Sequence, residues 1–124
     1  TDDELVVLEE IIQEITTYKK IAQEQHRYEE YASLDVKFHV EVAKISKNDF
    51  LFHLINSIRQ SLTAMNIQLL SSCLHSYIPL LVDAHREIFE AIRDGEPRKA
   101  EEAMHKHYEL VYKGIRIFQE TETY

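Results

Sequence analysis

Four residues that can bind a divalent metal ion occur in the middle of apolar helical stripes. Asp35 and His39 lie one helical turn apart in SLDVKFHVEV (residues 33–42), on the side of the helix that carries most of its apolar residues. His85 and His107 hold the same kind of position in two later helical stretches. One carboxylate and three neutral imidazoles are an ordinary set of ligands for zinc, nickel, manganese or iron.

Burying these polar side chains is costly unless each finds a partner. A buried polar group without a hydrogen bond costs about 1–3 kcal/mol, and one ion bound by all four side chains would satisfy them together. The pattern alone leaves two interpretations open: a metal centre in the core, or core histidines with ordinary hydrogen bonds. Four more histidines lie in expected connections or off the apolar stripes, and we do not expect them to bind metal: His26, His53, His75 and His105.

The elements that must position these side chains are helices. Apolar residues recur with a period near 3.6 through almost the whole sequence, which contains only two Gly and two Pro. Thr1 opens a capping-box sequence for a first helix, Asn48 or Asp49 can cap the third, and Gly95 with Pro97 separates the last two. After the first helix, which ends before residues 23–27, we expect helices at about 28–46, 50–71, 78–93 and 98–118, with a loop at 72–79. The predicted fold class is all-α, an antiparallel bundle of about five to six helices.

Composition excludes several classes of protein. The 124 residues suffice for one domain with a real core. A net charge of −8, from 22 acidic and 14 basic residues, argues against nucleic-acid binding by this segment itself. The single cysteine, Cys73, excludes an internal disulfide, and no apolar run is long enough for a membrane span. We therefore expect a cytoplasmic protein.

Three stretches of the sequence together resemble a known family. They are LDVKFHVEVAKISKND, AHREIFEAIRDGEPRKAEEAM and HKHYELV, with 46 residues from the first motif histidine to the second and 22 from the second to the third. Over nearly all of the chain they resemble the FadR C-terminal (FCD) domain of GntR-family bacterial transcription regulators. In the metal-binding members of that family, these positions ligate a divalent ion. The resemblance therefore implies a metal site at Asp35, His39, His85 and His107, with zinc as the first expectation and nickel, manganese or iron as alternatives.

The resemblance also implies a regulatory protein that works as a homodimer. Full-length members carry an N-terminal winged helix-turn-helix domain that binds operator DNA, and we expect that domain to be absent from these 124 residues. The family domain usually begins with one more helix than this sequence supplies, so we expect the pocket residues found here to be incomplete. The first helix has a wider apolar surface than one internal contact needs, which favours a dimer contact through Val6, Val7, Leu8, Ile11 and Ile12.

The function implied by the resemblance is sensing of a small organic acid, with no catalysis. Four protein ligands on a metal that accepts five or six leave one or two positions for a carboxylate. Arg59 matches an arginine that is frequent at this family position and is our candidate for the effector's second contact. Asn66, two turns later on the same flank, is a candidate hydrogen-bonding residue. For Arg59 the alternative is an exposed side chain in a surface ion pair.

Two other functions fit the same four ligands. A metal held by three histidines and an aspartate on a helical bundle also describes a hydrolase or a transferase in which the ion activates water. Against an enzyme, no further carboxylate or histidine stands on the stripes to act as a general base. The ion would be purely structural if its coordination proved closed.

Overall fold

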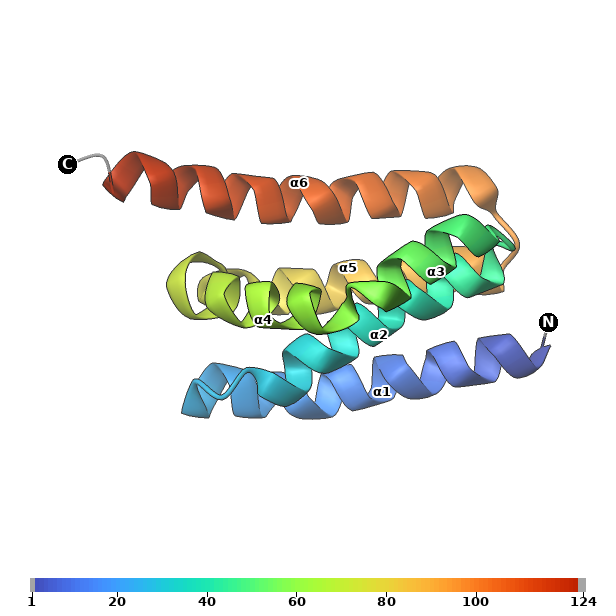
Figure 1. The fold of residues 1–124 in the computed structure, drawn as a ribbon, viewed down its shortest axis with the longest axis horizontal. Coiled ribbons are helices and arrows are strands. Elements are labelled where there is room, and N and C mark those ends of the chain that lie inside the picture. Colours follow the sequence, from blue (N-terminus) through green and yellow to red (C-terminus); the bar gives the residue numbers. More distant parts are fainter. Residues whose placement is uncertain (1, 123–124) are drawn as a thin grey trace. The chain divides into compact units, whose positions relative to one another are not determined.

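The chain is built of helices joined by short connections. The computed structural model describes residues 2–122 and divides the chain into two compact units, Thr1–Gln68 and Leu69–Tyr124. The described residues contain no β-strand, so the predicted all-α class is confirmed (Figure 1). Among residues 2–122, no helix has the length and apolarity that crossing a membrane would require.

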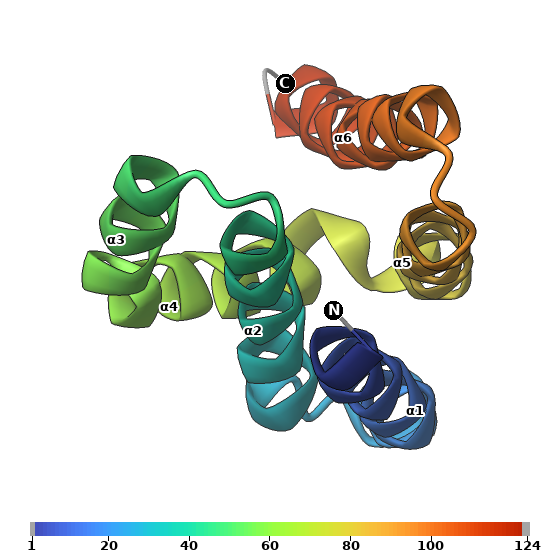
Figure 2. The same cartoon turned by 90° about the vertical axis from the view of Figure 1, so that its right-hand side faces the viewer.

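The first unit begins with an antiparallel pair of helices. Both views show the first two helices side by side (Figures 1 and 2). Asn48 caps the third helix as expected, since its side-chain oxygen accepts a hydrogen bond from the Leu51 amide at 3.0 Å. Thr1, the expected cap of the first helix, lies outside the described residues. The helices are α1 (Asp2–Gln25), α2 (Glu29–Ile45), α3 (Asp49–Ser57) and α4 (Arg59–Leu69).

Within the first unit, α1 and α3 both pack against α2. The sequence pattern placed one apolar stripe on α2, which includes Tyr31 and Phe38, and both are fully buried. Leu34, Val36 and Val40 are buried too, on other sides of the same helix. Apolar residues are thus buried on more than one side of α2, so the partly buried Asp35 and His39 depend on the groups that surround them.

Most of the apolar surface of α1 is buried within the protein. Leu8, Ile11 and Ile12 are buried, whereas Val6 and Val7 are exposed. Three of the five residues that suggested a dimer contact therefore belong to the core. The exposed apolar surface that remains on α1 is small.

The single helix predicted at 50–71 is wrong, because the chain leaves the helical conformation at Ile58. There φ is −106° and ψ is 14°, and this residue separates α3 from α4. Neither Gly nor Pro marks the break in the sequence. None of the described residues of α3 is buried, and its apolar side chains include Phe50, which is 78% exposed, and Leu54.

The second unit holds an antiparallel pair of helices, α5 (Ile78–Arg93) and α6 (Pro97–Glu122). The loop expected at 72–79 is largely wrong, since a π-helical turn (Leu70–Leu74) and a 3₁₀ turn (His75–Tyr77) lead directly into α5. Gly95 ends α5 with a φ of 67°, its amide donating to the Ile92 carbonyl, as expected for a glycine cap. Pro97 begins α6, also as predicted.

Candidate metal centre

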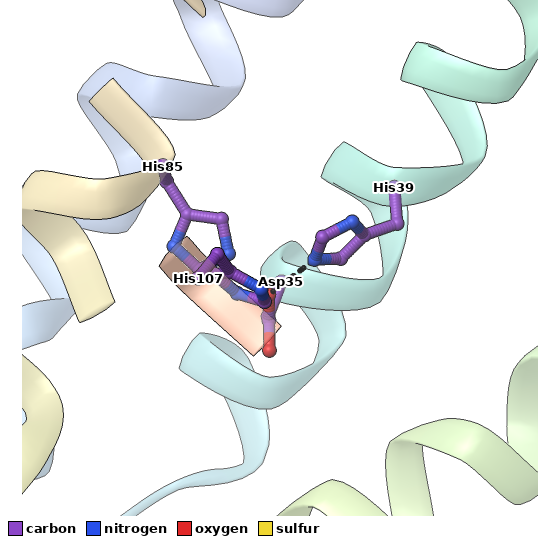
Figure 3. A group of neighbouring side chains, drawn as sticks. All are labelled: Asp35, His39, His85 and His107. Atoms are coloured by element: carbon purple, nitrogen blue, oxygen red, sulfur yellow. Dashed lines mark ion pairs between the residues drawn. The ribbon is translucent and has the colours of Figure 1, made fainter. Parts of the chain in front are cut away.

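The first unit presents a carboxylate and an imidazole together on α2. The Asp35 and His39 side chains lie four residues apart on one side of the helix, with Asp35 Oδ1 3.3 Å from His39 Nε2 (Figure 3). Both are mostly buried, with exposed fractions of 17% for Asp35 and 20% for His39. A helix spacing of four residues is what lets two side chains on adjacent turns bind the same ion.

Asn66 fixes the second carboxylate oxygen of Asp35. Its side-chain amide, on α4, donates a hydrogen bond of 2.7 Å to Asp35 Oδ2. The carboxylate therefore faces His39 with one oxygen and is held from α4 by the other. Hydrogen bonds of this kind orient metal ligands and influence metal affinity. The sequence analysis predicted Asn66 as an effector-binding residue, but it did not predict the hydrogen bond from Asn66 to Asp35.

The second unit presents two imidazoles in contact with each other. His85 on α5 and His107 on α6 are both buried, with exposed fractions of 1% and 4%. Their ring centroids are 4.7 Å apart and the ring planes are inclined by 61°. Each ring offers a nitrogen within 4.8 Å of one on the other. Two nitrogens that bind one ion with bonds of about 2.0–2.1 Å lie at most about 4.2 Å apart, so a shared ion requires these two to lie within that smaller limit or to move slightly closer together.

The four residues predicted as metal ligands thus form two pairs, one in each unit. Figure 3 draws them with their helices. Each pair could supply two ligands to a metal ion. The donor set of three imidazole nitrogens and one carboxylate is chemically suited to zinc, nickel, manganese or iron. None of the other four histidines belongs to a group of close potential ligands within the described part of the chain.

Two of those other histidines have identified partners. His105 Nε2 lies 3.0 Å from Glu109 Oε1 on the exposed side of α6. His26 Nδ1 lies 3.0 Å from the Tyr28 hydroxyl in the connection between α1 and α2. These contacts give both imidazoles a role without a metal ion.

Arg59, the predicted effector contact, is the first residue of α4 and is partly exposed. Its backbone carbonyl accepts a hydrogen bond from the Thr63 hydroxyl. Its guanidinium forms no ion pair or hydrogen bond with any other residue in 2–120, the range over which side chains are described. Within that range, the structure gives no support to the alternative in which Arg59 forms a surface ion pair.

Tyr31 adds a polar group that the sequence did not reveal. It lies one turn before Asp35 on α2 and is 1% exposed, yet its hydroxyl has no hydrogen-bond partner among residues 2–122. Burial raises the pKa of the Tyr31 phenol well above its ordinary value of 10.0, and the negative charge of Asp35 raises that pKa further. The hydroxyl is therefore protonated at neutral pH. The spacing Tyr31, Asp35, His39 was visible in the sequence, but we assigned the tyrosine only to the apolar stripe.

Comparison with known proteins identifies the family. The family model described as the FCD domain matches residues 1–110, which is most of the chain. No curated protein matches the sequence. The all-α fold, the match to the family model and the three motif stretches all indicate the same family. The chain belongs to the FCD domain family, whose members are the C-terminal domains of GntR-family regulators.

Proposed function

We propose that this FCD domain binds one divalent metal ion through Asp35, His39, His85 and His107 and senses a small carboxylate with it. The observation that carries the proposal is that, within each unit, the two proposed ligands already lie close together. The first unit holds Asp35 and His39 turned toward each other, and the second holds two buried imidazoles at a spacing that one ion can bridge. Packing these polar groups into apolar helices is costly, and metal coordination offsets that cost.

The proposed ion is zinc, with nickel, manganese or iron as alternatives. Zinc binds imidazole nitrogen and carboxylate oxygen readily, and its sites with open positions accept a further ligand. Nickel, manganese and iron take the same donors and accept up to six ligands. In each case the four side chains leave room for an external oxygen ligand.

A carboxylate satisfies such a site because it can bind the metal and a guanidinium at once. We propose Arg59 as the second contact, since its guanidinium has no ion-pair partner among residues 2–120. Asn66 reaches the carboxylate of Asp35, so its amide is close to a metal ligand and is proposed to contact the effector beside it. The effector class is therefore a mono- or dicarboxylate, including hydroxy and sugar acids.

The biological role we propose is transcription regulation. FCD domains are regulatory domains, so we favour sensing over hydrolysis or group transfer. A winged helix-turn-helix domain of the full-length bacterial protein would contact operator DNA in the cytoplasm. Effector binding changes DNA binding only if the acid has different affinities for two arrangements of the protein, and then it shifts their populations.

Metal binding should stabilise the domain, because the folded chain binds the ion better than the unfolded chain does. At a zinc concentration of about 100 times Kd, the gain is about 2.7 kcal/mol, or a rise in Tm of roughly 10 °C. We expect EDTA to remove this rise in the wild type. His107→Ala should lose most of it, whereas the exposed control His105→Ala should keep it. Differential scanning calorimetry measures the effect, and identical curves with and without EDTA would contradict metal binding.

Effector binding should require both the metal and a carboxylate. In calorimetric titrations of the zinc-loaded protein, we expect an acid such as lactate to bind and the matching amide, lactamide, to fail. Arg59→Ala should weaken binding by about 10- to 100-fold, the contribution of a charge-assisted hydrogen bond, without changing zinc affinity. Equal affinity of the acid for metal-free and zinc-loaded protein would leave the ion a purely structural role and refute metal-dependent sensing.

We further propose that the domain forms a homodimer, in which a second copy covers the exposed apolar residues of α3. Phe50, Leu51 and Leu54 are exposed there, and this surface is larger than Val6 and Val7 on α1. Light scattering should therefore return twice the 14.7 kDa mass of one chain. Phe50→Glu should shift the mass toward the monomer, and Gln60→Glu, an exposed change on α4 with the same charge, should not. A monomer mass for the wild type at high concentration would refute the dimer.

A further inference from the structure

Gly114 lies in the interior of α6, where helix preference alone would favour another residue. Glycine is the poorest helix former after proline, because it loses the most conformational freedom and has no side chain to pack. Gly114 is nevertheless buried, on the side of α6 that packs against the π-helical turn Leu70–Leu74. A buried glycine inside a helix therefore needs a packing explanation.

The explanation is the close approach of two side chains to the α6 backbone. A methyl group at position 114 would lie 2.5 Å from Leu74 Cδ2 and 3.2 Å from Tyr77 Cε2. Carbon atoms in contact normally lie about 3.5–4.0 Å apart, so the first distance is too short by about 1 Å. Leu74 is 1% exposed, so its side chain has little room to turn away. A larger residue at position 114 would therefore push α6 away from this turn.

The same side of α6 carries His107. Gly114 follows His107 by seven residues, or two helical turns, so the two lie on one side of the helix about 10.5 Å apart. His107 in turn packs against His85 of α5, with ring centroids 4.7 Å apart (Figure 3). How closely α6 packs at Gly114 therefore affects the separation of the two imidazoles.

We propose that Gly114 is a positioning residue for metal binding, because it lets α6 pack closely enough for His107 to share an ion with His85. Their nitrogens lie within 4.8 Å of each other, and two nitrogens on one ion lie at most about 4.2 Å apart. Metal ligands must be held within about 0.5 Å of their working positions, so an outward shift of about 1 Å would exceed that tolerance. This inference rests on the proposed function, since it needs an ion at the two imidazoles.

The test compares zinc affinity with the stability of the metal-free protein. Zinc dissociation constants are measured by competition with a chelator for wild type and Gly114→Ala, at a temperature where circular dichroism shows both metal-free proteins to be folded. We expect Gly114→Ala to bind zinc about 10- to 100-fold more weakly, as when residues that orient metal ligands are replaced. Its metal-free Tm should fall although alanine is the better helix former, because the added methyl group has no room.

Leu74→Val tests the physical cause, because it removes the Cδ atoms that the new methyl group would meet. The double variant Gly114→Ala/Leu74→Val should recover most of the zinc affinity, and Leu74→Val alone should bind zinc as the wild type does. Lys113→Ala, an exposed change at the neighbouring position of α6, is the matched control and should keep wild-type zinc affinity.

Wild-type zinc affinity in Gly114→Ala would overturn the role given to Gly114 and leave metal binding itself standing, since Leu74 would then have given way in place of α6. A double variant that binds zinc no better than Gly114→Ala would overturn it too. If Gly114→Ala alone does not fold, the double variant decides: wild-type zinc affinity supports the proposal, and weakened affinity or failure to fold overturns it. If the wild type binds no zinc, the proposed metal site fails and the inference falls with it.

Discussion

A polar side chain that is packed among apolar ones needs a hydrogen-bond or metal partner. This requirement applies to the polar residues on the apolar faces of α2, α5 and α6. Asp35 and His39 are largely shielded from bulk water, with exposed fractions of 17% and 20%. His85 and His107 are buried more completely still. Apolar residues at these four positions would pack with less cost, and this cost is one reason why we propose that the four side chains bind an ion. A divalent ion is the partner that suits this combination of donors.

The same requirement extends outward from the ligands. Asn66 donates to Asp35 and so ties α4 to the carboxylate, which restricts how the carboxylate can turn. Tyr31, one turn before Asp35 on α2, is buried, and burial together with the charge of Asp35 raises the pKa of its phenol, so the hydroxyl is protonated. The proposed ligands Asp35 and His39 and the amide that orients Asp35 thus come from α2 and α4 of the first unit. If an acid binds there, it is recognised by the elements that also hold the ion.

The sequence predicted the features that follow from local rules. A period near 3.6 predicted helices, and Asn48, Gly95 and Pro97 predicted where some of them begin and end. The same period placed Asp35 and His39 on one side of α2. The break at Ile58 could not be predicted, because neither Gly nor Pro marks it. The π-helical and 3₁₀ turns of residues 70–77 were not predicted, since the sequence pattern indicated a loop at 72–79.

Contacts between distant residues were the least predictable part of the site. The hydrogen bond from Asn66 to Asp35 joins residues 31 positions apart, and no periodicity within one helix reports it. Burial of Leu34, Val36 and Val40 likewise depends on neighbours that a single helix pattern does not contain. Tyr31 fits the apolar stripe by its ring, and the pattern does not report that its hydroxyl is buried. Helix periodicity selected the four residues and suggested a metal centre, and the family resemblance then implied a metal site at the same four positions.

The central claim is that the two pairs share one ion. X-ray absorption spectroscopy of the zinc-loaded chain, with the zinc content measured on the same sample, tests it most directly. The account predicts one zinc per chain with three imidazoles and one carboxylate, and the loss of one imidazole in His39→Ala and also in His85→Ala. Two ions per chain, or a spectrum that one of these substitutions leaves unchanged, would show that the pairs act separately and contradict the account.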